Sequence, residues 1–488
     1  MGDKSITSHT SLRVAKYPVG IQYRAQCIYS ILCVGMNDIR MVGILGSGGI
    51  GKTTIAKAIY NLIADQFEAT CFLPNVRETS AGERGLVKLQ EMLLSEILGG
   101  SNLKVDTDDR GINMIKERIC RKKILLILDD VDQVKQLENL AGERDWFGSG
   151  SRIIITTRDL NVLTNHDVDF TYEVKGLNWE ESLQLFNWSA FKGDNPPSGE
   201  YRELTEQIIH YAGGLPLALQ VLGSDLHGKS ICEWRSALKD YKGSPHQDIQ
   251  KVLRISYDRL GKNEKNIFLD IACFFKGEET KFVTEILDNC GFSANIGIRK
   301  LLDKCLVTIS ATYQYPCKII LEMHDLLQEM GREIVREESP EDPSGRSRLW
   351  FHEDVRTVLE ENMGTNKIEA ILVRLPKGHD SIQLSPKAFM EMKRLRLFIN
   401  REACLSGKIN SLPNELRVLD WFGYHLPFLP SNFHGKKLSY LRMNYSNMIQ
   451  DVRVLEHMNL TVLNFSYSEL LKKIPNLSGH SNLKGIDS

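Results

Sequence analysis

The sequence has almost no net charge and no long apolar run. Over 488 residues, 61 lysine and arginine side chains face 62 aspartate and glutamate side chains, which leaves a formal net charge of −1. Such a chain has no overall attraction for nucleic acid or for an anionic membrane surface. No apolar stretch approaches the roughly 20 residues of a membrane-spanning helix, and the amino terminus has no signal-peptide core. We therefore expect no membrane span and no specific nucleic-acid partner.

Cysteine pairs at metal-binding or redox spacing are also missing. The ten cysteines are scattered, none forms a Cys-x-x-Cys pair, and several, such as Cys71 and Cys273, lie inside apolar segments. This usage is typical of reduced core residues and argues against a disulfide or zinc framework. It predicts a cytoplasmic protein, or a nuclear one. The length alone favours three or four domains.

The segment from Gly46 to Thr53 has the pattern of a phosphate-binding loop. It reads Gly-Ser-Gly-Gly-Ile-Gly-Lys-Thr, and it stands between the apolar run Met41–Leu45 and a stretch with apolar residues at helical spacing. Glycines let the backbone N–H groups turn toward an anion, Lys52 reaches the outer phosphates, and the Thr53 hydroxyl ligates magnesium. The pattern predicts a strand, a loop and a helix that bind a nucleoside diphosphate or triphosphate.

A second apolar run ends in two carboxylates. Residues 123–128 are almost entirely apolar, and Asp129 and Asp130 follow them. A buried parallel strand delivers such acids to the carboxyl edge of its sheet, where Asp129 would hold Mg²⁺ and Asp130 would orient or activate water. Taken alone, the same residues fit a strand followed by an Asx-type turn.

Strands and helices alternate through the first half of the chain. Four further β-prone segments predict a doubly wound parallel sheet: Thr70–Leu73, Ile124–Leu128, Arg152–Thr156 and Thr171–Val174. Arg158 follows the third of them by two residues, at the edge where a nucleotide would sit. There it would reach a terminal phosphate, although a lone arginine is also compatible with a solvated surface charge.

Helical periodicity replaces the strand signals from about Leu177. We predict the following helices: Glu180–Phe191, Tyr201–Ala212, Leu215–Leu226, Ile249–Leu260, Glu264–Phe275 and Ile296–Cys305. Pro216 and Leu217 fit the first turn of one of them. Two strands, Leu306–Ser310 and Lys318–Met323, and a helix over Asp325–Glu337 then complete a winged-helix pattern. His324 lies at the strand-to-helix junction, where a histidine commonly caps or packs.

A repeat occupies the last third. A leucine followed three residues later by another apolar residue recurs at Leu395, Leu416, Leu438, Leu460 and Leu483, at intervals of 21, 22, 22 and 23 residues. This interval predicts a leucine-rich solenoid, in which each unit adds a strand to a shared core and lines a concave face with polar side chains. The last unit stops at Ser488 without a visible capping sequence, so we expect a truncated solenoid.

The ordered motifs together resemble one family. The chain is similar to the NB-ARC and leucine-rich-repeat part of plant immune receptors of the type that usually carries a TIR domain. The matching segments are residues 17–21, 46–54, 71–78, 125–132, 150–159, 214–217, 268–275 and 323–325. The resemblance implies a switch that ADP holds closed, and that opens and self-associates with ATP after a pathogen effector or a guarded host protein is perceived through the repeats.

Site residues follow from that resemblance one by one. It implies that Val19 and Ile21 flank the adenine, that Pro216 packs near the base, that Arg158 senses a terminal phosphate, and that His324 contacts the ADP β-phosphate. The expected nucleotide-binding set is Val19, Ile21, Gly46, Gly48, Gly49, Ile50, Gly51, Lys52, Thr53, Thr54, Arg158, Pro216, Leu217 and His324. The expected Mg²⁺ ligands are Thr53 and Asp129, and Asp130 is the catalytic candidate.

The expected fold class is multidomain, with an α/β P-loop NTPase domain, an all-α domain, a winged helix and a leucine-rich solenoid. The expected domains are an N-terminal tail (1–17), a nucleotide-binding domain (18–175), a helical ARC1 domain (176–247), a winged-helix ARC2 domain (248–345) and the start of the leucine-rich repeats (346–488).

Two other functions compete with the switch. One is a truncated adaptor or decoy, because nothing before Tyr17 is long enough for a TIR domain, and the NAD-cleaving activity associated with that domain is then not expected in this chain. The other is a turnover ATPase. Asp130 stands where many fast ATPases use glutamate, and the sequence identifies no arginine finger, so at most slow hydrolysis is expected.

Overall fold

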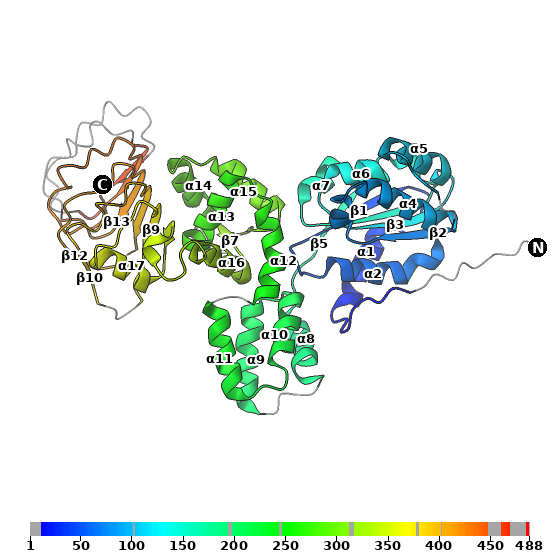
Figure 1. The fold of residues 1–488 in the computed structure, drawn as a ribbon, viewed down its shortest axis with the longest axis horizontal. Helices are drawn as coiled ribbons and strands as arrows, with labels where there is room; N and C mark the ends of the chain where they lie inside the picture. Colours follow the sequence, from blue (N-terminus) through cyan, green and yellow to red (C-terminus); the bar gives the residue numbers. More distant parts are fainter. Residues whose placement is uncertain are drawn as a thin grey trace, which may run out of the picture. The chain divides into compact units, whose positions relative to one another are not determined.

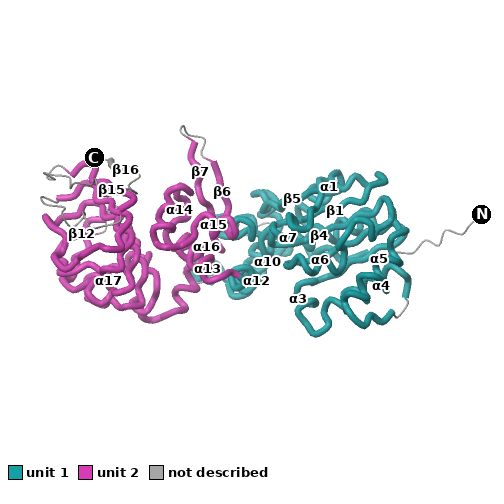
Figure 2. The backbone as a smooth tube through the Cα atoms, turned by 90° about the horizontal axis from the view of Figure 1, so that it is seen from above, with its two compact units in different colours: residues 1–259, 302–306 teal, residues 260–301, 307–488 magenta. Residues whose placement is uncertain are grey.

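The computed structural model describes residues 11–100, 103–193, 198–243, 246–311, 317–376, 380–401, 403–447, 460–468 and 485–487. The chain forms two compact units, which Figure 2 colours separately. The first comprises residues 1–259 with 302–306, and the second comprises residues 260–301 with 307–488. No described helix is both long and apolar enough to cross a membrane.

A parallel five-stranded sheet forms the centre of the first unit. Its strands, β1 (Arg40–Leu45), β2 (Ala69–Leu73), β3 (Ile124–Val131), β4 (Arg152–Thr157) and β5 (Phe170–Glu173), lie in the order β2-β3-β4-β1-β5. Every neighbouring pair is parallel. The predicted parallel sheet is confirmed, and each predicted strand overlaps an observed one.

Helices cover both faces of this sheet (Figure 1). Side chains alternate along a strand, so Met41 and Leu45 of β1 join one buried apolar cluster, whereas Val42 and Ile44 join another on the opposite face. The first cluster includes residues of α4, α5 and α6, and the second includes residues of α1 and α2. The helices around the sheet are α1 (Ile21–Leu32), α2 (Lys52–Ile63), α3 (Val76–Ser80), α4 (Gly85–Leu98), α5 (Asp108–Ile119), α6 (Val134–Ala141) and α7 (Leu160–Asn165).

Helices alone follow the sheet in the first unit. They are α8 (Trp179–Phe191), α9 (Gly199–Ala212), α10 (Pro216–Leu226), α11 (Ile231–Gly243) and α12 (Gln247–Asp258). The predicted break before Pro216 is present, because Gly213 ends α9 in the left-handed conformation and Pro216 is the first residue of α10. The first unit continues to Arg259 and also includes residues 302–306. The expected domain boundaries at residues 175, 247 and 345 stay predictions.

The winged-helix pattern lies mainly in the second unit. Its elements are α13 (Lys262–Asp270), a π-helix (Ile271–Phe275), α14 (Thr280–Asn289), α15 (Ala294–Asp303), the antiparallel strands β6 (Thr308–Ala311) and β7 (Ile319–Glu322), and α16 (Asp325–Arg336). The predicted helix over Glu264–Phe275 is present, as the greater part of α13 followed by the π-helix. All five residues of the π-helix are buried, and its wider turn directs them into the core.

Parallel strands continue to the end of the second unit. The sheet β16-β15-β14-β13-β11-β9-β8 contains one strand per predicted repeat from β11 onward. Leu395, Leu416, Leu438 and Leu460 are all buried in one apolar cluster, and Leu483 lies outside the described residues. The elements are β8 (Arg348–Leu349), α17 (His352–Glu360), β9 (Ala370–Val373), β10 (Ile382–Leu384), β11 (Leu397–Asn400), β12 (Leu405–Gly407), β13 (Val418–Trp421), β14 (Tyr440–Arg442), β15 (Val462–Asn464) and β16 (Gly485–Asp487).

Candidate functional site: a phosphate loop and its polar network

The predicted loop joins β1 to the amino terminus of α2. Gly49 and Gly51 have φ angles of 78° and 100°, a conformation that residues with a Cβ rarely adopt. Gly51 caps α2, and no side chain accepts a hydrogen bond at this cap. The first-turn N–H groups of a helix capped in this way form a seat for an anion.

Lys52 lies inside the curve of the loop. Its Nζ donates hydrogen bonds to the carbonyl oxygens of Gly46 at 2.8 Å and Ser47 at 2.9 Å. The side chain is buried, and burial lowers the pKa of Lys52 to about 7. A phosphate group beside the ammonium would restore its charged form.

Three oxygen-bearing side chains meet behind the loop. The Thr53 hydroxyl donates to Asp129 Oδ1 at 2.8 Å, and the Thr156 hydroxyl donates to the same oxygen at 2.7 Å. Burial raises the pKa of Asp129, against the opposing effect of these two hydrogen bonds. A hydroxyl and a carboxylate are oxygen ligands of the kind that Mg²⁺ takes in proteins, so the donor set fits the expected ion.

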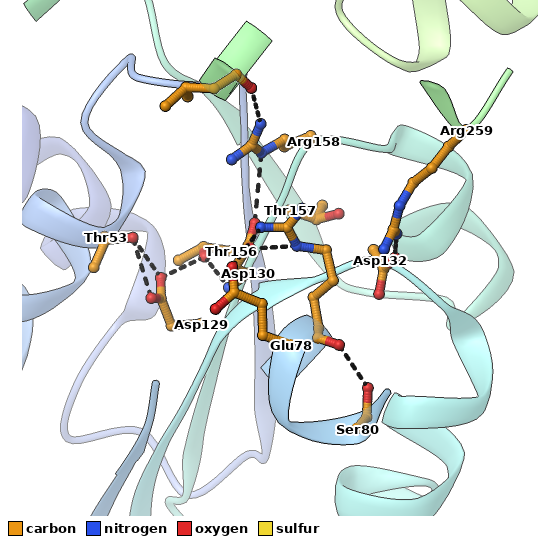
Figure 3. A network of polar contacts seen from close by, with 12 residues as sticks. Thr53, Glu78, Ser80, Asp129, Asp130, Asp132, Thr156, Thr157, Arg158 and Arg259 are labelled. Atoms are coloured by element: carbon orange, nitrogen blue, oxygen red, sulfur yellow. Dashed lines mark hydrogen bonds and ion pairs between the residues drawn. The ribbon is translucent and has the colours of Figure 1, made fainter. Parts of the chain in front are cut away.

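Asp130 has different partners from its neighbour, as Figure 3 shows. Arg77 Nε donates to Asp130 Oδ2 at 2.7 Å, and Arg158 Nε lies 3.5 Å from Asp130 Oδ1. The Asp130 N–H donates to the Thr156 hydroxyl at 2.8 Å, and Asp130 has a left-handed φ of 60°. Asp129 therefore faces the loop, whereas Asp130 is an ion-pair partner. Its expected role in activating water stays a prediction.

Arg158 lies against the phosphate loop. A Cβ placed on Gly48 would come within 2.6 Å of an Arg158 guanidinium nitrogen. Burial lowers the pKa of Arg158. Beside it is a cavity of about 470 Å³, lined by Arg77, Asp130, Val131, Asp132, Gln133, Thr157, Arg158, Asp159, Ile255, Ser256, Arg259 and Lys304.

Among the other expected residues, Leu217 contacts the phosphate loop and Pro216 is next to Leu217 in the chain. Leu217 donates from its N–H to the Gly49 carbonyl at 3.2 Å, and its side chain lies 2.8 Å from a Cβ built on Gly49. Pro216 is the adjacent residue at the start of α10. Val19 is buried, and Ile21 packs against the apolar cluster beneath α1 and α2. Their contacts with an adenine stay predictions.

His324 belongs to the second unit. It caps α16, and its Nδ1 accepts a hydrogen bond from the Leu326 N–H at 3.1 Å. The next residue, Asp325, forms an ion pair with Lys276 within the same unit. The capping role that the residue pattern suggested is thus present, and the implied contact with a β-phosphate stays a prediction.

Three members of this network have no role that the sequence predicts. Arg77 lies inside a segment that supports the family resemblance, Thr156 precedes Arg158 by two residues, and Val252 contacts Arg158 through a main-chain carbonyl. Only the first two carried a signal, because they lie inside segments that match the family, residues 71–78 and 150–159. A main-chain contact 94 residues away leaves no mark in a sequence.

Two sequence families match this chain. Residues 22–195 match the NB-ARC domain. Residues 261–339 match the winged-helix domain described as Disease resistance protein Roq1-like. The first match covers the phosphate loop and most of the polar network, and the second covers His324.

Plant resistance proteins are similar over almost the whole chain. Disease resistance protein RUN1 of Vitis rotundifolia is 42% identical over 96% of this chain, and TMV resistance protein N of Nicotiana glutinosa is 38% identical over 98%. The chain spans 37% and 41% of the lengths of these relatives. A solved structure of the Aeropyrum pernix ORC2 protein matches 65% of this chain and 93% of its own, with a TM-score of 0.37 and 14% identity.

Proposed function

Because this chain belongs to the NB-ARC family of plant disease resistance proteins, we propose that it is the switch region of an immune receptor, operated by ADP and ATP. ADP holds the closed state, and ATP accompanies opening and self-association. The observation that carries this proposal is the phosphate loop, in which left-handed glycines and a buried Lys52 lead into an amino terminus of α2 without a side-chain cap.

The chain's own groups support nucleotide binding. The main-chain N–H groups from Gly49 to Thr54 and the Lys52 ammonium would hold the phosphates. Thr53 and Asp129 would hold Mg²⁺, which neutralises phosphate charge when it is bound. Val19, Ile21 and Pro216 would enclose the base. These roles rest on the loop geometry and on the family.

Switching requires contacts that differ between the two nucleotide states, because a ligand shifts an equilibrium only by its difference in affinity for the two conformations. We assign the terminal-phosphate contact to Arg158 and the ADP β-phosphate contact to His324. Arg158 lies against the loop in the first unit, and His324 belongs to the second. An ADP contact that His324 makes in the closed form alone would stabilise that form.

The repeat region would recognise the activating molecule. The parallel strands β11, β13, β14, β15 and β16 follow at the repeat interval, and the leucines before four of them share one buried cluster. These features support a leucine-rich solenoid, whose concave face would bind a pathogen effector or a guarded host protein. The cellular site we propose is the cytoplasm, with the nucleus as the alternative.

The nucleotide released from freshly purified and then denatured protein tests this function. We expect ADP at close to one molecule per chain. Lys52→Arg should retain less, because a broad planar guanidinium does not fit the place of the compact ammonium. Lys57→Arg, on the same helix, is the matched control and should retain as much as the wild type. Equal nucleotide in Lys52→Arg and the wild type would contradict the role of the loop.

A further inference from the structure

Arg158 joins the phosphate loop to helix α12. Its NH1 donates to the main-chain carbonyl of Val252 at 2.9 Å, and Val252 lies in the first half of α12. A Cβ on Gly48 would lie 3.1 Å from both the Val252 carbonyl oxygen and its Cγ1. The loop, the guanidinium and the helix are therefore in direct contact within the first unit.

The guanidinium is incompletely satisfied in this arrangement. Arg158 Nε is buried and has no hydrogen-bond partner among the described residues. Its nearest carboxylate oxygen, Asp130 Oδ1, is 3.5 Å away, and the other oxygen of Asp130 accepts from Arg77 at 2.7 Å. Figure 3 shows Arg158 and its link to this network. A neutral carbonyl and a shared carboxylate thus hold a cation that a phosphate oxygen would bind more strongly.

We propose that Arg158 is a two-position coupling residue that transmits the presence of a terminal phosphate to α12; this inference rests on the proposed nucleotide function. In the first position, Arg158 bonds to Val252 and holds α12 against the loop. In the second position, the terminal phosphate of ATP binds the guanidinium, and the Val252 carbonyl no longer accepts a hydrogen bond from Arg158. ADP has no terminal phosphate and leaves the first position in place.

The position of helix α12 allows it to respond when the hydrogen bond between Arg158 and Val252 is lost. Ile249, Leu253 and Tyr257 form its buried face, and Ile255 and Ser256 line the cavity beside Arg158. The helix ends at Asp258, one residue before the chain first leaves the first unit. Weaker attachment of α12 to the loop therefore affects the last helix before the chain enters the second unit.

Hydrogen–deuterium exchange of the whole chain tests this coupling. Wild-type protein is stripped of nucleotide and loaded with either ADP or a non-hydrolysable ATP analogue with Mg²⁺. Since one hydrogen bond is exchanged, amides of α12 should exchange about two- to tenfold faster with the ATP analogue than with ADP. Equal exchange in α12 with both nucleotides bound would overturn the proposal.

Two variants separate the contact from a general loosening. Arg158→Gln should give fast α12 exchange with either nucleotide, so that the difference between the nucleotides disappears. Lys251→Gln removes a cation from the exposed side of the same helix and should keep the wild-type difference. A nucleotide-dependent difference that persists in Arg158→Gln would also overturn the proposal. If Arg158→Gln does not fold, the two wild-type samples decide.

Nucleotide binding is measured in the same samples, which keeps the two proposals distinguishable. If stripped, folded wild-type protein binds neither adenine nucleotide, the proposed function fails. If it binds both and α12 exchanges equally with each, the function stands and the coupling through Arg158 fails.

Discussion

At the scale of single residues, Lys52 has the most consequential environment. In the folded protein its pKa is lowered to about 7 by burial, whereas an unfolded chain keeps the usual lysine value of about 10.4. Between these pH values the unfolded chain binds the proton more than the folded chain does. The contribution of Lys52 to the free energy of unfolding therefore rises as the pH increases from about 7 to about 10.

Nucleotide binding should consequently take up a proton at alkaline pH. At pH 8 the phosphates of ADP are already ionised, and an anion beside Lys52 favours its charged form. We expect an uptake of up to about one proton per bound ADP. Calorimetric titrations of stripped protein in two buffers of different ionisation enthalpy measure it. Identical binding heats in the two buffers would show that Lys52 does not change its protonation.

The sequence predicted some contacts of the network around the phosphate loop but not others. The pattern placed Lys52, Thr53 and Asp129 together, because a phosphate loop and the acid that ends a parallel strand meet at one sheet edge. In the sequence pattern, Asp130 differed from Asp129 only in its expected role, which was to orient or activate water. The ion pair of Asp130 with Arg77 joins α3 to β3 across 53 positions, and no local periodicity encodes such a pair.

At the scale of elements, a buried carboxylate ties α13 to the parallel ladder of the second unit. Asp270 is fully buried, accepts from Arg348 Nε at 2.6 Å, and accepts from Arg396 NH2 at 2.9 Å. Burial acts to raise the pKa of Asp270, but the two guanidinium groups outweigh it and the pKa is lowered. The stability that this carboxylate contributes is therefore present above its unfolded pKa and lost as the pH falls through the lower, folded value.

Asp270→Asn should destabilise the second unit by about 3–5 kcal/mol, because two guanidinium groups would remain buried without their carboxylate. Denaturant unfolding followed by the tryptophans measures the change. Glu391→Gln, which removes an exposed carboxylate paired with Lys393, is the control and should change stability by less than about 1 kcal/mol. A similar small change for both variants would contradict the role of Asp270.

Elements differed in how well the sequence predicted them. Strands β1 to β4 were found because apolar, β-prone runs mark strands buried on both faces, whereas β5 is mostly exposed and was found from its β-prone residues alone. The π-helix after α13 was missed, since its residues are apolar on every side and a 3.6-residue period cannot distinguish it from an α-helix. Helix α11 was not predicted, although Ser230 and Glu233 have the spacing of a capping box and exchange hydrogen bonds at its start. The strands β10 and β12, of three residues each, were not predicted either.

At the scale of the whole molecule, the proposed switch assigns the ADP β-phosphate contact to His324. His324 is the expected contact from the second unit, and it also caps α16 through Nδ1. A substitution that removes the imidazole changes both features at once. Two variants are therefore needed, one that removes both the cap and the predicted ADP contact and one that keeps the cap.

His324→Ala should release labelled ADP roughly ten- to a hundredfold faster, the effect of losing one hydrogen bond to a charged group. His324→Asn keeps a side-chain acceptor for the cap, because asparagine is a favoured N-cap residue. We therefore expect His324→Asn to release ADP as fast as His324→Ala. Fast release in the alanine variant alone would show that His324 acts through its cap on α16 and not through a contact with ADP.

The proposed switch requires that the loop from Gly46 to Thr53 binds an adenine nucleotide. Calorimetric titration of the stripped, folded chain with ADP, and with ATP and Mg²⁺, measures this binding. We predict saturable binding of each nucleotide at about one site per chain, weakened in Lys52→Arg and unchanged in Lys57→Arg. A folded protein that produces no binding heat with either nucleotide, and that carried none before stripping, would show that this loop does not bind adenine nucleotides.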